Sequence, residues 1–238
     1  MQPSLSSTFI TAELETWKSS FGFDLLAWAP LPRPVQFQFY SNWLQEQRHG
    51  DMNYLKTHEP LKEDPSRLMP QARSLISVAV RYSPHPHPVP ATPKSLKVAK
   101  YAQGADYHNW LTGRLTQLAE SLQEKIPGFD FLVASDSKPL LERDLAEQLG
   151  LGWIGKNTCL IHPKKGSFFL LGEILTNVEV TEMTGTEAVP DFCGKCTRCL
   201  DACPTGALIE PRKLDATKCI SYWTIETKEI APEPLRSQ

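Results

Sequence analysis

The chain has 238 residues, of which 22% are charged, and its formal net charge is −2. This length allows one large domain, or a domain with a small appendage, and it is enough to bury a core. The near-neutral charge excludes general attraction to a polyanion, so any contact with nucleic acid has to be local. Because we find neither a secretory signal pattern nor a long apolar run, we expect a cytoplasmic protein without a membrane span.

The first half of the chain alternates helical and extended patterns. Helices are predicted over residues 12–21 and 37–48, and strands within 21–34 and over 74–82. Residues 83–94 then hold five prolines together with His85 and His87. We interpret this segment as an extended surface loop whose histidines are solvated and are not metal ligands.

The second half repeats the alternation of helix and strand. A helix is predicted over 107–126, where four leucines recur at three- and four-residue steps, and another from Pro139 to Gly150. Strands are predicted over 129–134, 158–161 and 167–176. The pattern predicts a mixed α/β core. A polar connector at 181–191 suggests a boundary between a main domain, 1–185, and a smaller module, 186–238.

Four of the six cysteines lie in CGKCTRCLDACP, which runs from Cys193 to Pro204. The spacing C-x2-C-x2-C-x3-C-P is the one by which bacterial-type ferredoxins hold [4Fe-4S] clusters, and its fourth cysteine belongs to a second cluster. Zinc sites usually use two separated C-x2-C pairs, and a disulfide framework spreads its cysteines more widely. An iron–sulfur module is therefore favoured over both.

Two further positions are candidates for proton chemistry. Asp136 follows the strand predicted at 129–134, where a carboxylate can face a ligand, but it can equally cap the next helix. His108, in the segment ADYH, is either a helix-start histidine or a catalytic one. No dinucleotide-binding or phosphate-binding glycine loop accompanies them.

The sequence resembles the epoxyqueuosine reductases throughout its length. The shared segments occur in the family order: the K-x-x-P of Lys62 to Pro65, SLISVAVRY, GADYH, SDSKPLLERDLAEQLGLGWIGKNTCLI, GSFFLLGEILT and CGKCTRCLDACPTGALIEPRKLDATKCISY. The resemblance implies a nitroreductase-like cobalamin-binding domain, related to reductive dehalogenases, followed by a ferredoxin-like iron–sulfur module. It also implies reduction of epoxyqueuosine to queuosine at the wobble position of tRNA. Electrons would pass through [4Fe-4S] clusters to cobalamin from a donor such as a flavodoxin or ferredoxin.

The resemblance also implies roles for particular residues. Asp136 matches the family's catalytic proton donor, and Tyr107 and His108 match its substrate side. The cofactor-binding positions are matched by Lys62, Asp136, Glu142, Arg143, Lys156, Asn157 and Leu160. Two positions depart from the family: Lys62 stands where relatives often carry Arg, and Lys138 stands where they generally carry Gly.

The implied metal ligands are Cys193, Cys196, Cys199, Cys203 and Cys219. In full-length relatives a second C-x2-C-x3-C-P supplies the other three thiolates, and this sequence lacks that segment. We therefore expect a C-terminally truncated family member with at most one secure cluster, whereas the family holds two. The alternative function is a non-catalytic electron carrier that binds cobalamin and an iron–sulfur cluster. Cys159 is interpreted as a core or cofactor-facing residue and not as a substitute ligand.

Overall fold

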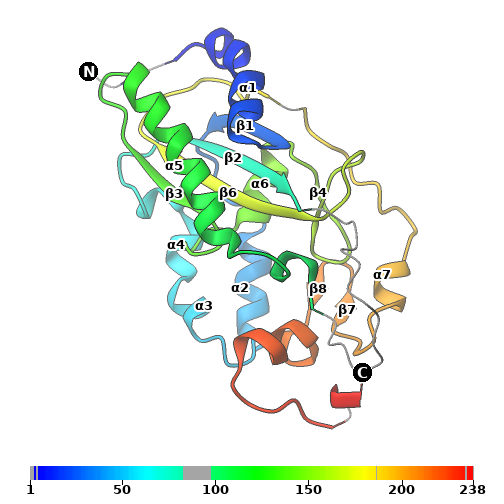
Figure 1. Ribbon diagram of the computed structural model, residues 1–238. Coiled ribbons are helices and arrows are strands. Elements are labelled where there is room, and N and C mark those ends of the chain that lie inside the picture. Colours follow the sequence, from blue (N-terminus) through cyan, green and yellow to red (C-terminus); the bar gives the residue numbers. More distant parts are fainter. Residues whose placement is uncertain (1–2, 4, 83–97, 186, 234, 238) are drawn as a thin grey trace.

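A four-stranded antiparallel sheet forms the centre of the molecule (Figure 1). The computed structural model describes residues 3, 5–82, 98–185, 187–233 and 235–237, so the proline-rich segment with His85 and His87 lies outside the described residues. The strand order is β1 (Leu25–Pro30), β2 (Ser74–Arg81), β6 (Phe169–Thr176) and β3 (Phe131–Ala134). The predicted mixed α/β class is confirmed, with every strand pair antiparallel.

Helices cover both faces of this sheet (Figure 1). On one face lie α1 (Ser7–Phe21) and α5 (Tyr107–Lys125), and the four leucines predicted on the inner side of α5 are all fully buried. On the other face lies α6 (Glu142–Gln148), which packs with the second hydrophobic cluster. Strand β2 contributes alternate residues to the two clusters, which explains why its sequence is almost continuously apolar.

The remaining elements gather at the end of the molecule where the chain terminates (Figure 1). They include α2 (Phe37–Gln45), α3 (Tyr54–Thr57), α4 (Glu59–Glu63), α7 (Arg198–Asp201), the hairpin β7 (Leu208–Glu210) and β8 (Lys213–Leu214), and the π-helical turn Tyr222–Glu226. A short pair, β4 (Trp153–Ile154) and β5 (Leu160–Ile161), connects α6 to β6. Single 3-10 turns complete the elements at Pro65–Arg67, Lys100–Ala102, Ala216–Lys218 and Leu235–Ser237.

The C-terminal residues are bonded to α2 and to the segment that follows it. Arg48 forms an ion pair with the buried Asp215 at 2.7 Å, and the Trp43 indole donates to the carbonyl of Leu214 at 2.6 Å. Tyr222 donates its hydroxyl to Asp51 at 3.0 Å. The predicted module 186–238 therefore packs closely on the first part of the chain, and its boundary stays a prediction.

Three helix boundaries differ from the sequence prediction for local reasons. Helix α1 begins earlier because Ser6 caps it by accepting from the Phe9 N–H. Helix α2 ends earlier, just before Gln47 turns into the left-handed region at φ 56°. Helix α6 begins at Glu142 and not at Pro139, because tight turns occupy residues 135–140. None of the helices among the described residues is both long and apolar enough to cross a bilayer.

Gly152, which directly precedes β4, provides a test of the close approach between this segment and β5. A Cβ at this position would lie 2.4 Å from the backbone oxygen of Ile161, whereas one at Gly113, within α5, would meet nothing within 4 Å. We expect Gly152→Ala to destabilise the fold by about 2–3 kcal/mol through backbone displacement. Gly113→Ala should instead stabilise it by about 1 kcal/mol, through higher helix propensity. Urea unfolding of both variants measures the two effects, and equal midpoints would contradict this packing.

Candidate functional site

Asp136 lies in a strained turn between β3 and α6. Its φ is 56°, in the left-handed region, and its backbone N–H donates to Glu142 Oε1 at 2.6 Å. The Asp136 side chain does not cap α6. The N-cap position of α6 is Leu141, where no side chain makes a capping hydrogen bond. The capping interpretation is therefore wrong. The carboxylate is 63% exposed and free to meet a ligand from outside.

Two side chains from the start of α5 face this carboxylate. Tyr107 donates its hydroxyl to Asp136 Oδ2 at 2.9 Å, and His108 Nε2 lies 3.4 Å from the same oxygen. Asp106 caps the helix by accepting the His108 N–H, and its Oδ1 lies 2.7 Å from His108 Nδ1. The rings of Tyr107 and His108 stack with their centroids 4.0 Å apart. The structure thus brings together the predicted acid and the predicted substrate-side residues.

The electrostatics of this group favour proton donors around Asp136. The hydrogen bond to Asp106 raises the pKa of His108, and the bond to Asp136 adds to the effect. Burial, followed by the hydrogen bond to Asp136, raises the pKa of Tyr107 well above its ordinary value. Tyr107 therefore keeps its proton at neutral pH. The cluster can hold a substrate oxygen and exchange protons with it.

A row of aromatic rings leads away from the cluster. Tyr101 packs edge-on against Tyr107 at 6.1 Å, Tyr82 follows at 6.4 Å from Tyr101, and Phe168 lies 5.4 Å from Tyr82. The Lys100 ammonium lies 5.5 Å from the centre of the Phe168 ring. Aromatic faces beside a cation suit a flat, anionic ligand such as a nucleotide.

Three of the predicted cofactor-binding residues gather near the start of α6. Lys62 is half-buried and donates to the carbonyl of Leu140 at 3.0 Å. Burial lowers the pKa of Lys62, while the charge of Glu142 opposes that shift. Arg143 donates to the carbonyl of Thr158. This side of the Asp136 turn therefore carries cationic donors close to the Glu142 carboxyl.

The other three predicted cofactor residues lie around the turn between β4 and β5. Lys156 does not point to Asp136, because its ammonium donates to the carbonyls of Gly194 at 2.7 Å and Cys196 at 3.0 Å. Asn157 accepts the backbone N–H of Cys159 at 3.2 Å, and Leu160 is buried in the core. Lys156 thus connects this turn to the cysteine segment, and the cofactor contacts of all three stay predictions.

All six cysteines are free thiols. The Trp153 indole donates to Cys193 Sγ at 3.4 Å, so the cysteine segment is also fixed from β4. Cys159 is exposed, which makes its interpretation as a core residue wrong. Within the described ranges, no three or more His, Cys, Asp or Glu side chains are gathered in a group that could hold a metal ion. The ligand roles of the five predicted cysteines stay predictions.

Sequence reasoning missed two buried polar residues beneath the site. Glu173 and Ser77 are fully buried in the middle of the sheet, on adjacent strands and in direct register. A glutamate within the otherwise apolar run FFLLGEIL was a usable signal, since an ionisable residue is seldom fully buried without a partner. Asp106 was also missed as the cap of α5, although Asp before a helix is a standard sign.

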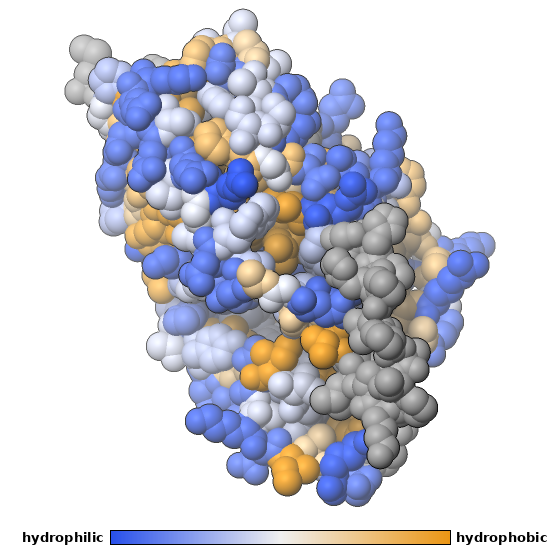
Figure 2. All heavy atoms as spheres, viewed as in Figure 1, coloured by the Kyte–Doolittle hydropathy of each residue, from blue (hydrophilic) through white to orange (hydrophobic). Residues whose placement is uncertain are grey.

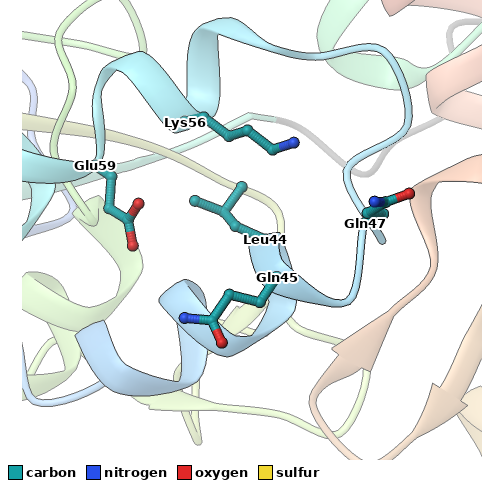
Figure 3. Close-up of a pocket in the computed structure, with 5 residues that line it drawn as sticks. All are labelled: Leu44, Gln45, Gln47, Lys56 and Glu59. Carbon is teal, nitrogen blue, oxygen red and sulfur yellow. The ribbon is translucent and has the colours of Figure 1, made fainter.

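Two cavities among the described residues lie away from this cluster. One of about 300 Å³ lies between α2 and the α3–α4 segment and is lined by Leu44, Gln45, Gln47, Lys56 and Glu59 (Figure 3). A second, of about 230 Å³, is lined by residues such as Ile220, Trp223 and Leu235 near the end of the chain. Neither contains a predicted site residue. Polar residues predominate over the face shown in Figure 2, with apolar residues in small groups.

Two family models match parts of this sequence. Residues 62–137, which include Lys62, the Tyr107–His108 pair and Asp136, match a model described as "Epoxyqueuosine reductase QueG, DUF1730". Residues 192–238 match a 4Fe-4S double cluster binding domain, and this range contains all five predicted cysteine ligands. The first match covers the candidate proton-transfer group, and the second supports iron–sulfur over zinc for the cysteine segment.

Named relatives agree with both models. Epoxyqueuosine reductase of Pseudomonas aeruginosa is 37% identical over 230 residues, and that of Escherichia coli is 36% identical over 239 residues. These alignments cover 95% and 99% of this chain, which spans 63% and 62% of the length of those relatives. A crystal structure of epoxyqueuosine reductase with an epoxyqueuosine-modified tRNA-Tyr stem loop is 28% identical, with a TM-score of 0.81 over 97% of this chain and 61% of that one. Over the residues that it contains, the chain is therefore similar to the epoxyqueuosine reductases in both sequence and fold.

Proposed function

We propose that this chain carries the catalytic site of an epoxyqueuosine reductase, which converts epoxyqueuosine to queuosine at the wobble position of tRNA. The reaction takes up two electrons and two protons and releases the epoxide oxygen as water. The observation that carries the proposal is the Asp136 carboxylate, exposed in a strained turn with Tyr107 and His108 directed at it. Asp136 would donate a proton to the substrate, and its two neighbours would orient it and the departing oxygen.

Cobalamin fits this site by the chemistry of the side chains present. Corrin rings carry amide groups on their rim, and Lys62, Arg143 and Asn157 offer an ammonium, a guanidinium and an amide as partners for them. These residues, with Glu142, would hold the cofactor near Asp136, and the buried Leu160 would support the turn that carries Asn157. When bound, cobalamin would supply a cobalt centre that passes reducing electrons to the substrate. The contacts of Lys156 place it at the cysteine segment, so we propose it as an indirect support of the cofactor site.

The cysteine segment would supply the electrons. Its thiols are the donor set that [4Fe-4S] clusters use, and the match to a double cluster domain supports that chemistry. Single electrons would come from a soluble donor such as a flavodoxin or ferredoxin. The competing proposal, an electron carrier without catalysis, shares these thiols but gives no role to Asp136.

The aromatic row beside Asp136 supports tRNA as the partner. Wobble bases are usually read after they leave the anticodon stack, by stacking on aromatic rings and by contacts to their edges. Phe168 is 41% exposed, and Trp110, at the start of α5, is also 41% exposed with Arg114 near its ring. Trp153 is buried and is not available for stacking. A cytoplasmic location would follow from the tRNA substrate.

Replacing Asp136 separates catalysis from cofactor binding. We expect Asp136→Asn to lower turnover of epoxyqueuosine tRNA by about 100- to 10,000-fold, because the proton donor is lost. Asparagine tolerates the left-handed backbone, so the turn and cobalamin binding should persist. Turnover is measured by mass spectrometry of tRNA digests. Cobalamin binding is measured by absorbance. Glu124→Gln, on the exposed side of α5, is the matched control, and full activity in Asp136→Asn would remove Asp136 from the mechanism.

His108 should titrate above the ordinary value of 6.5. Its raised pKa means that its contribution to stability is present below pH 6.5 and is lost as the pH rises through the folded-state pKa. Asp106→Asn keeps a good helix cap but removes the charge, so we expect the pKa of His108 to fall. NMR titration of the ring protons measures this. His162, whose pKa is lowered by burial, should titrate unchanged, and an equal shift at both residues would contradict the assignment.

Metal content distinguishes the possible states of the cysteine segment. After anaerobic reconstitution we expect about four or fewer irons per chain, because five thiols cannot complete two clusters. Iron and acid-labile sulfide analysis gives this number. Cys196→Ser should lower it, whereas Cys159→Ser should leave it unchanged. About eight irons in the 238-residue chain would contradict the expectation and show that another chain supplies ligands.

A further inference from the structure

Glu173 occupies the middle of the sheet, where an apolar residue is expected. It is fully buried on β6, and strand alternation places it on the same face as Leu175, which belongs to the hydrophobic cluster on the α6 side. Its register partner on β2 is Ser77, whose hydroxyl donates to Glu173 Oε1 at 3.5 Å. An ionised carboxylate with so weak a partner is strongly disfavoured in such surroundings.

The second carboxylate oxygen of Glu173, Oε2, lacks a hydrogen-bond donor within the described part of the chain. Oε2 is buried and makes no hydrogen bond to any described residue. Glu142 on α6 interacts with the Glu173 side chain, and as a carboxylate it is also an acceptor. Two acceptors that face each other are satisfied when one of them carries a proton. A proton on Glu173 turns its unsatisfied oxygen into a donor directed at Glu142.

The surroundings decide which of the two acids holds this proton. Glu142 accepts the Asp136 N–H at 2.6 Å, and the charges of Lys62 and Arg143 also favour its ionised form, against the charge of Asp136. Glu173 has only the Ser77 hydroxyl on its side. Burial raises the pKa of Glu142 to about 7, and it raises the pKa of Glu173 well above the ordinary range. The proton therefore belongs on Glu173 when Glu142 is ionised.

We propose that Glu173 is a protonated positioning residue, which donates a hydrogen bond to Glu142 and through it holds the Asp136 turn in its left-handed conformation. A non-glycine residue stays in this region of φ only where its surroundings hold it there. The order of contacts runs from the sheet at Glu173, through Glu142, to the backbone of Asp136. The benefit for catalysis rests on the proposed function, but the protonation state and the rigidity of the turn do not.

Infrared spectroscopy of the cofactor-free, 238-residue chain tests the proton directly. At pH 8 we expect a carbonyl band of a protonated carboxylic acid, which disappears in Glu173→Gln. Asp144→Asn is the matched control, because Asp144 is also buried on α6 but accepts a backbone N–H from Gln36. That variant should keep the band. Absence of the band from the wild-type chain, or its persistence in Glu173→Gln, would overturn the proposal.

Hydrogen exchange at the Asp136 amide tests the positioning role. We expect exchange about tenfold faster in Glu142→Ala and Glu173→Leu, since the acceptor or its support is lost. Glu173→Gln should exchange like the wild type, because its amide N–H replaces the lost O–H donor. Equal acceleration in the Gln and Leu variants would overturn the proposal, and so would no acceleration in Glu142→Ala. Thermal melting identifies a Leu variant that does not fold, in which case the infrared result and Glu142→Ala decide.

Enzyme assays separate this inference from the proposed function. If the chain reduces epoxyqueuosine, Glu173→Leu should lose turnover in proportion to its faster amide exchange, and Glu173→Gln should retain it. A chain without reductase activity would overturn the proposed function and leave both spectroscopic readouts intact. An active Glu173→Leu enzyme with a loosened turn would overturn the catalytic role of the positioning.

Discussion

The hydrogen bond from the Asp136 backbone to Glu142 joins the exposed site to the core. It spans the tight turns at residues 135–140, which connect β3 to α6, and it fixes a residue that has a left-handed backbone without being glycine. This bond holds the backbone of Asp136 in the position from which its carboxylate meets Tyr107 and His108. Those two are themselves fixed by the first turn of α5, so the cluster forms where two independent elements meet.

The antiparallel register supplies the rest of the geometry. Ala134 pairs with Glu173, and Glu173 pairs with Ser77, so the end of β3 lies beside the one ionisable residue in the buried centre of β6. Burying an ionised carboxylate in a sheet covered on both faces costs desolvation free energy. No water reaches the group to lower this cost. The cost is offset if the buried group is neutral and satisfied, which the contact with Glu142 allows.

The sequence was sufficient for the long helices and strands and insufficient for the turns and the short elements. The apolar runs of β2 and β6 and the leucine spacing of α5 predict elements that the structure contains, because burial alone determines those patterns. The start of α6 was misplaced because Pro139 is as compatible with a tight turn as with a helix, and the turn is held by Glu142, which accepts the Asp136 N–H. The tertiary pairing of Glu142 and Glu173 has no local signature. Resemblance to a family predicted Asp136 as the acid, but it did not predict the contacts that hold the Asp136 turn.

In the turn between β4 and β5, the family resemblance and the observed contacts indicate different roles for Lys156. Lys156 belongs to a segment that the family resemblance associates with cofactor binding, yet its ammonium bonds to two carbonyls of the cysteine segment, and the Trp153 indole approaches Cys193. On the other side of the same turn, Arg143 from α6 reaches the carbonyl of Thr158. A displacement of the cysteine segment therefore acts on the turn, and through Arg143 on the first turn of α6, where Glu142 meets Asp136. The cysteine segment and the proposed proton donor are thus mechanically connected through a few side chains, so the geometry of one depends on that of the other.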